Sequence, residues 1–577
     1  MAIRGLVRRV HAKEIHKFMG GARGQSGMRI QYLLIGETEP GLKCYVYLRL
    51  KGRSTCSFIR PSHTTATLLP SFASPPQANE RLSGHRAVLF VAMGTEHPTT
   101  SGLKNSPADI LYLIFKELSS VEYHALCLAN RDLGLVAERL MYSKIKWFWG
   151  NTPTDPPPQL PQLVRTLFSR PVLATYITQV HLDGNNWLQN TRRWNLPRFP
   201  LADADLEKPS AFIRRIGVPY ADVWIEGLRD GNMDALLALL LSQLSNLRRL
   251  HLGFDFTRRS ALIGMLLRSA LYDPEHNHGA GAGALPTYQH LHDVSFLRRV
   301  NADEAFHSKT RNTADVLPFF YLPNVQCIAA SVQNPLDVFV WPAAATHKPC
   351  PSQLTSLDLR SIREGCLGEL LAVTPNLEIL HWEWYFDNGV ADRFTTQTID
   401  LDRIGRELSL VSSTLTELTI SAEIGIAFAV GDQFWPGLKA EGSLAGLAGM
   451  HKIQRLCVPW AFLAGFVPDT TSKRLPQDVL PRNVEFLTVT DDLALQGCDY
   501  MDPWPPWEWS SDAMLEVLRA WLDDWKACTP RLRGITMRIS YLADDTELWC
   551  AGAGVELREL GTQCGVPIEV IEVSEDF

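Results

Sequence analysis

The 577-residue sequence lacks the short motifs that mark metal- or nucleotide-dependent enzymes. Its eleven cysteines include no C-x-x-C pair, so no zinc-ligand spacing is present. It contains no H-E-x-x-H, G-x-S-x-G, Walker or protein-kinase motif. These absences favour a non-catalytic protein with no cofactor and no metal. Scattered cysteines of this kind are typical of free thiols in a reducing compartment.

A long hydrophobic run is also missing. The longest, residues 235–244, is about half of the ~20 residues that a membrane-spanning helix needs. The basic start, residues 1–18, has no apolar core of the kind found in signal peptides, and a mitochondrial presequence is the alternative. We therefore predict a protein of the cytoplasm, the nucleus or both, with no membrane partner.

Acidic residues are scarce at the N-terminus. Residues 1–100 contain 14 Lys and Arg, five Glu and no Asp, whereas the rest of the chain has a net charge of −15. The whole chain carries −6, so there is no chain-wide basic signal for nucleic-acid binding. We interpret residues 1–100 as a basic, poorly ordered extension. One hypothesis is that Met93 is the native start.

Residues 101–146 predict a small helical module. Ser106 and Pro107 are a suitable N-cap and first helical residue. Apolar residues then follow at steps of three and four, which predicts one broad apolar stripe. Ser119 and Glu122 form a capping-box pattern, so a second helix should begin there and end near Asn130. A third helix should follow, which makes three short helices joined by tight turns.

The remainder of the chain alternates between strand and helix patterns. Residues 147–165 are rich in proline and predict a stiff linker. Beyond it, an apolar-x-x-apolar-x-apolar pattern occurs ten times between residues 177 and 537, often after Pro or Asn. Most intervals exceed the roughly 20–29 residues of regular leucine-rich repeats. We predict a mainly α/β fold, an irregular leucine-rich-repeat-like solenoid over residues 166–577. An ordinary α/β domain with a parallel sheet is the alternative.

The helical module resembles an F-box. The family pattern begins Leu-Pro, continues with an acidic residue, Ile-Leu and Ile-Phe, and ends its first helix at Leu. The matching residues here are Pro107, Asp109, Ile110, Leu111, Ile114, Phe115 and Leu118, with Ser106 in place of the first leucine. Residues 161–184 look like the start of the leucine-rich-repeat-like region of fungal F-box proteins.

The resemblance implies an adaptor. F-box domains bind the Skp adaptor of SCF-type cullin–RING ubiquitin ligases, while the C-terminal domain captures a protein substrate. No covalent bond to ubiquitin is made by such a subunit. The expected Skp-binding residues are Pro107, Ile110, Leu111, Ile114, Phe115, Leu118 and Leu126. In the alternative, the module caps the chain's own repeats.

Alternate strand positions should form a substrate-binding face. Apolar positions of each strand point into the core, so the residues between them point out. The candidate substrate face is His251, Asp255, Asp358, Arg360, His381, Glu383 and Arg538. The alternative is a solvated sheet face with cross-strand charge pairs. Likewise, the tryptophan-rich segments 381–387 and 502–510 are either interface or packing beneath a loop. His276 and His278, beside a glycine run, predict a surface loop.

Two functions fit this organisation. One is the substrate receptor of an SCF-type ligase, and the other is a non-catalytic interaction scaffold whose F-box-like module acts outside ubiquitination. Whether a cullin co-purifies with the chain through Skp would separate them.

Overall fold

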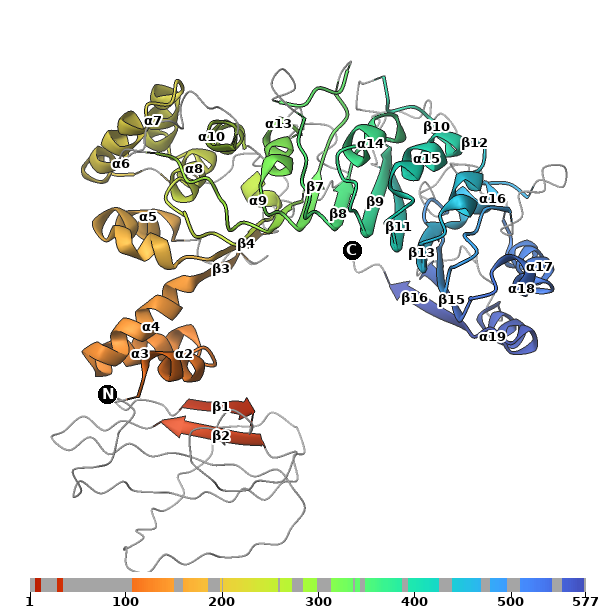
Figure 1. The fold of residues 1–577 in the computed structure, drawn as a ribbon, viewed down its shortest axis with the longest axis horizontal. Coiled ribbons are helices and arrows are strands. Elements are labelled where there is room, and N and C mark those ends of the chain that lie inside the picture. The colour runs from red at the N-terminus through yellow and green to blue at the C-terminus, as the bar shows by residue number, and fades with distance from the viewer. Residues whose placement is uncertain are drawn as a thin grey trace, which may run out of the picture. The chain divides into compact units, whose positions relative to one another are not determined.

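The computed structural model describes the helices, the strands and the turns that join them (Figure 1). The described residues are 6–11, 29–34, 106–149, 159–184, 198–199, 201–257, 260–271, 284–297, 313–335, 338–342, 348–386, 393–424, 438–468, 478–494, 509–541 and 553–574. The chain divides into two units, Met1–Tyr142 and Ser143–Phe577, which we treat separately. Most of the predicted basic extension, including Met93, lies outside the described residues, as does the His276 and His278 loop.

The first unit contains an antiparallel strand pair and a group of helices. Strand β1 (Leu6–His11) pairs with β2 (Arg29–Leu34). The helices are α2 (Ala108–Phe115), α3 (Ser120–Ala129) and α4 (Arg131–Ser143). The predicted capping box is confirmed, because the side chains and backbones of Ser119 and Glu122 bond reciprocally. Helix α2 differs slightly from the prediction, since Pro107 rather than Ser106 is its N-cap residue.

Asn130 sets the tight turn between α3 and α4. Helix α3 ends just before Asn130, as predicted, and the Asn130 N–H donates a hydrogen bond to the Leu126 carbonyl. The side-chain Oδ1 of Asn130 accepts hydrogen bonds from the N–H groups of Asp132 (2.9 Å) and Leu133 (3.3 Å). Asparagine therefore caps one helix and starts the next, because its short amide reaches the free N–H groups of a first turn.

The second unit is built on one large parallel sheet. Its twelve strands, within the described part of the chain, are paired in chain order without any reversal. They are β3 (Lys144–Trp149), β4 (Gln179–Gly184), β5 (Arg249–Leu252), β6 (Asp293–Phe296), β7 (Cys327–Ser331), β8 (Ser356–Arg360), β9 (Ile379–Phe386), β11 (Glu417–Ile424), β13 (Arg455–Pro459), β14 (Phe486–Thr490), β15 (Gly534–Tyr541) and β16 (Ile568–Ser574). Two short strands, β10 (Thr398–Asp400) and β12 (Lys439–Glu441), pair separately.

The α/β class with a parallel sheet is confirmed, and all ten predicted strand segments lie in this sheet. The predicted linker over residues 147–165 extends too far at both ends, and residues 150–158 lie outside the described residues. Residues 147–149 belong to β3, which follows α4 directly, and α5 begins at Leu160. The aromatic residues of 147–149 belong to a strand that pairs with β4, so proline content alone misplaced the boundary.

Helices and 3₁₀ turns fill the connections of this unit. They are α5 (Leu160–Ser169), η2 (Pro171–Tyr176), α6 (Asp203–Ile216), α7 (Ala221–Arg229), α8 (Met233–Leu241), α9 (Phe254–Thr257), α10 (Ala261–Leu271), α13 (Thr313–Val316), η3 (Leu317–Tyr321), α14 (Glu364–Leu371), α15 (Leu401–Leu408), η4 (Ser409–Val411), η5 (Leu444–Gly449), α16 (Trp460–Ala464), α17 (Ser511–Leu522), α18 (Trp525–Cys528) and α19 (Ala553–Cys564). No helix of the described segments is long and apolar enough to cross a membrane.

The core lies between the sheet and these helices. Along β8, Leu357 and Leu359 are buried while the residues between them are partly exposed. Helices α13, α14 and α15 lie along one side of strands β7 to β11 (Figure 1). The alternation therefore gives β8 an inner face, which packs on helices, and an outer face with the polar residues Asp358 and Arg360.

A continuous backbone ladder joins the strands at their N-terminal ends. The carbonyl just before a strand accepts hydrogen bonds from two consecutive N–H groups of the next strand segment. The Thr355 carbonyl, for example, accepts from Glu378 and Ile379, both at 2.9 Å. The Glu378 carbonyl accepts from Thr416 (2.8 Å) and Glu417 (3.0 Å) in the same way. The pattern runs from Thr178 to Gln454, so the sheet strands from β4 to β14 are held in one register.

Side-chain amides reinforce this ladder. Asn376 donates to the Ser352 carbonyl at 2.8 Å, and Asn324 donates to the Gln289 carbonyl at 2.7 Å. Asn246 makes the same bond to Thr175 at 2.8 Å. These are asparagines that precede strands in the sequence. Asparagine recurs at this position because its side-chain amide donates a hydrogen bond to a carbonyl in the preceding turn.

An ion pair is buried where α14 begins. Arg363 and Glu364 are joined by two hydrogen bonds of 2.9 and 3.0 Å, and their side chains are 0% and 6% exposed. Trp384 donates to Glu364 at 3.1 Å, and its ring lies 4.2 Å from the Arg363 guanidinium. Arg363 also donates to the carbonyls of Thr396 and Thr398. The pair thus links α14, β9 and the segment that leads into β10.

The aromatic segment at β9 is packing rather than interface. Trp382 and Trp384 are 1% and 0% exposed, and Tyr385 and Phe386 are also buried. Trp509 is buried and donates to the Gly465 carbonyl at 2.9 Å, while Trp504 and Trp507 lie outside the described residues.

We predict that Glu364→Ala lowers the free energy of unfolding by about 3–5 kcal/mol, because it leaves the Arg363 charge buried without its partner. Urea unfolding followed by circular dichroism measures the change. The control is Arg533→Ala, which removes a 3.2 Å pair with Glu485 whose arginine is 67% exposed. Its loss should stay below about 1 kcal/mol. Equal losses in the two variants would contradict the role of the buried pair.

Candidate functional site

The outward residues of the sheet form aligned rows, which together we call the open face. Residues that are Cα partners across neighbouring strands lie side by side in such a row. One row contains Lys146, His181, His251 and Ser295 on β3 to β6, and it continues with Asp358 and His381 on β8 and β9. Two polar clusters stand out on this face.

The first cluster joins β4 to β5. The rings of His181 and His251 stack with their centroids 4.0 Å apart and their planes 23° apart. The Oδ2 atom of Asp183 lies 3.9 Å from Nε2 of His251. One ligand atom from each of the three side chains lies within 4.8 Å of the other two, and all three residues are half-buried.

Burial sets the charge of these histidines. Desolvation lowers the pKa of both imidazoles below the usual value. Lys146 lowers both pKa values further, and Asp183 opposes that effect. His251 also lies beside Asp293, which pairs with Arg249 at 3.6 Å. At neutral pH the two rings are therefore mainly neutral, with a lone pair free on one nitrogen of each.

The second cluster lies on β8 and β9. The Arg360 guanidinium is 3.6 Å from a carboxylate oxygen of Asp358 and 3.6 Å from one of Glu383. Glu383 is only 17% exposed. Burial raises its pKa to about 7, against the opposing effect of Arg360, and Glu423, Asp358 and Asp492 add to the rise.

Asp492 and Arg538 extend this cluster towards β14 and β15. Asp492 accepts a 2.8 Å hydrogen bond from the Ala422 N–H, so it bonds to β11 across the strand between them. Burial raises its pKa, while the bonds from Ala422 and Thr490 and the charge of Arg538 act against the rise. The cluster thus concentrates carboxylates on the open face beside two arginines.

The sheet brings together some of the predicted face residues and separates others. Asp358, Arg360 and Glu383 form one cluster, and His381 lies beside Asp358 with its Nε2 3.9 Å from Glu417. His251 belongs to the other cluster. Arg538 is exposed, and its positive charge lowers the pKa of Asp492. Asp255 is not on a strand but in α9, and its side chain lies outside the described residues, so its place on the strand face was wrong.

Sequence patterns did not single out Asp492, Glu423 or Lys146. Lys146 alternates with apolar Ile145 and Trp147, which is a period-two signal for β3. Asp492 follows the end of β14 and reaches β11 only through the fold, so nothing in the sequence indicated its partner.

The predicted Skp-binding residues divide between core and surface. Leu111 and Phe115 are 5% and 0% exposed and form the core of the helical group with Ala137 and Leu140. Ile114, Leu118 and Leu126 are partly buried against that core. Ile110 is half-buried and Pro107 is exposed. The expectation that Leu111 and Phe115 anchor a partner directly therefore needs correction, because these two side chains face inward.

Other apolar side chains of this helical group are exposed. Tyr112 and Leu113 of α2 are 46% and 40% exposed, and Val121, Leu128 and Leu135 on α3 and α4 exceed 60%. Leu113 and the exposed apolar side chains of α3 and α4 are typical of an interaction surface, whereas Tyr112 lies well around α2 from Ile110.

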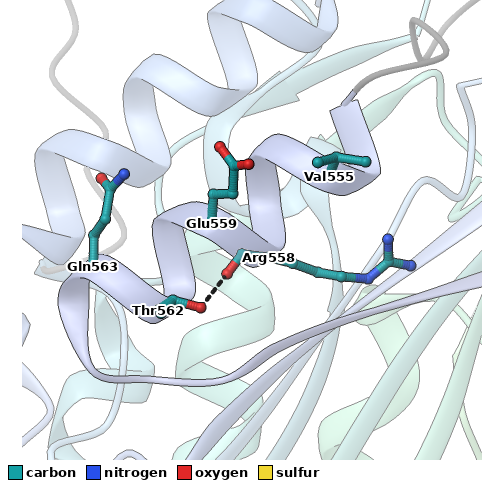
Figure 2. A pocket seen from close by; sticks show the side chains of 5 residues that line it. All are labelled: Val555, Arg558, Glu559, Thr562 and Gln563. Carbon is teal, nitrogen blue, oxygen red and sulfur yellow. Dashed lines mark hydrogen bonds between the residues drawn. The ribbon is translucent and has the colours of Figure 1, made fainter.

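A hollow along α19 has fewer converging polar groups than the open face. It is lined by Val555, Arg558, Glu559, Thr562 and Gln563, all from one helix. In Figure 2 Arg558 points away from Glu559 and Gln563, so the polar groups do not converge. Thr562 donates its hydroxyl to the Arg558 carbonyl at 2.9 Å, which is a bond within the helix. The open face therefore remains the better candidate for a site.

Comparison with models of known protein families and with curated proteins finds no match for this chain.

We predict that the Glu383 carboxyl makes stability depend on pH. Its raised pKa means that the folded chain holds a proton which the unfolded chain has released, between the ordinary value near 4.5 and about 7. The free energy of unfolding should therefore fall as pH rises through this window, by up to about 1.4 kcal/mol per pH unit from this group. Glu383→Gln should remove that contribution, as urea unfolding at several pH values would measure.

Arg360→Gln provides the comparison. Because Arg360 holds the pKa of Glu383 down, its loss should move the upper end of the window to higher pH. A wild-type pH slope in Glu383→Gln would contradict the assignment.

Proposed function

We propose that the chain is the substrate-recognition subunit of an SCF-type cullin–RING ubiquitin ligase. In this proposal helices α2, α3 and α4 are an F-box that binds the Skp adaptor. Strands β3 to β16 form a leucine-rich-repeat-like solenoid that presents the open face to a target protein. The subunit positions its target and makes no covalent bond to ubiquitin, and it acts in the cytoplasm, the nucleus or both.

The observation that carries the proposal is that the F-box pattern residues of α2 lie on two sides of the helix, one in the core and one outside it. The pattern residues Leu111 and Phe115 hold the three helices together. Pro107, Ile110 and Ile114 follow another side of α2, at steps of three and four residues. That side continues through exposed Leu113. A helical group with so few core residues gains little stability alone, so a partner that covers this side would add to it.

Strand order supports the solenoid part of the proposal. In the twelve-stranded sheet the strands lie in the same order as along the chain, so each one pairs with the sheet strands that precede and follow it in the chain. A doubly wound α/β domain reverses its strand order at a switch point. Stacking in one direction is typical of repeat proteins, which use the extended face of such a stack for binding.

We predict that Ile110→Asp combined with Leu113→Asp abolishes co-purification of Skp and cullin. Two carboxylates placed on the proposed contact side would have to be buried without partners. Affinity purification of the tagged full-length chain, with immunoblots for Skp and cullin, measures the outcome. Both residues lie outside the core formed by Leu111 and Phe115, so the helices should stay folded.

Tyr112→Asp is the matched control. It places the same charge on α2 at a residue 46% exposed, but well around the helix from Ile110. It should retain Skp. Cullin binding retained by the double variant would overturn the proposal, and a wild-type chain that binds no Skp would favour the scaffold without a role in ubiquitination.

A further inference from the structure

We propose that His181, His251 and Asp183 form a binding site for a divalent transition-metal ion on the open face. This inference does not depend on the proposed ligase role. It rests on the geometry of two neighbouring strands, on the packing of one carboxylate, and on the chemistry of the three side chains.

The first step is the register between β4 and β5. His181 and His251 are Cα partners, and neighbouring strands lie about 4.8 Å apart. Both side chains leave the same face of the sheet, which is why their rings stack at 4.0 Å. Two imidazoles held in this way present nitrogen atoms to the same volume of space. The two residues are 70 positions apart in the chain, and the sheet alone brings them together.

The second step is the position of the carboxylate. Asp183 is two residues beyond His181 on β4, so its side chain leaves the same face. Gly253 lies opposite, where its N–H donates to the Leu182 carbonyl at 2.8 Å. A Cβ atom at residue 253 would lie 2.2 Å from Oδ1 of Asp183. The absence of a side chain at Gly253 therefore allows the carboxylate to lie against the strand end beside His251.

The third step is ligand geometry. One nitrogen or oxygen atom from each residue already lies within 4.8 Å of the others. Around a tetrahedral zinc ion with bonds of about 2.0–2.1 Å, ligand atoms are about 3.3 Å apart. Side-chain rotations on a half-buried surface supply the remaining approach of roughly 1–1.5 Å.

The ligand set selects the class of ion. Two imidazoles and one carboxylate suit zinc, cobalt, nickel or iron(II), whereas calcium and magnesium prefer oxygen ligands alone. Three protein ligands leave a coordination position for water or for a group from a bound molecule. Lys146, on the neighbouring strand in the same row, is a positive charge that opposes the ion. Lys146→Gln should therefore tighten binding.

Titration calorimetry of the purified full-length chain with zinc chloride tests the proposal. We expect one ion per chain at this site. His181→Ala and His251→Ala should each weaken binding at least about tenfold, and Gly253→Ala should weaken it by displacing Asp183. The double variant His181→Ala with His251→Ala measures the zinc that the cysteines bind, because the cysteines are present in every variant.

His381→Ala is the matched control. It removes a histidine of the same row whose side chain is 47% exposed, and whose neighbours supply no second imidazole. It should leave zinc affinity unchanged. Circular dichroism establishes that each variant is folded. Wild-type binding no tighter than that of the double histidine variant would overturn the proposal, and so would an equal loss in His381→Ala.

Discussion

The repeated backbone bond before the sheet strands from β5 to β14 is the constraint on which the second unit depends. One carbonyl accepts two consecutive N–H groups of the next strand segment, and the arrangement passes from Thr178 through Thr355 to Gln454. Each strand is thereby fixed both in direction and in register. Asparagine amides such as those of Asn324 and Asn376 tie the preceding turns together at the same level. Parallel strands without this fixed start would be free to slip, and a shift of one residue would turn every core leucine outward.

Fixed register is also what creates chemistry on the open face. Residues far apart in sequence become neighbours because they occupy equivalent positions on successive strands. His181 meets His251 in this way, and Arg360 meets Glu383. Charged groups on this face act on one another, and the pKa of Glu383 is raised in part by Asp492, which follows the end of β14. The α2–α4 group of the first unit is organised instead by a small core that contains Phe115.

Sequence patterns predicted where the strands lie in the chain better than they predicted which strands and side chains lie next to one another. The ten apolar-x-x-apolar-x-apolar segments are all strands because the inner face must be apolar at alternate positions. Strands β3 and β16 were not among these ten segments and were missed. Pairing order and register depend on bonds between distant segments, so the two polar clusters were not predictable. The inward direction of Leu111 and Phe115 depends on how α2 meets α4, which an apolar stripe alone does not reveal.

The order of strands in the sheet has a consequence for how the second unit is made. Each strand docks on one that precedes it in the chain, so its template is complete before it leaves the ribosome. The unit can grow by addition at one edge during synthesis, without waiting for a distant segment to close the sheet. The edge that receives each new strand advances from β4 towards β16, while β3 stays at the opposite edge of the sheet.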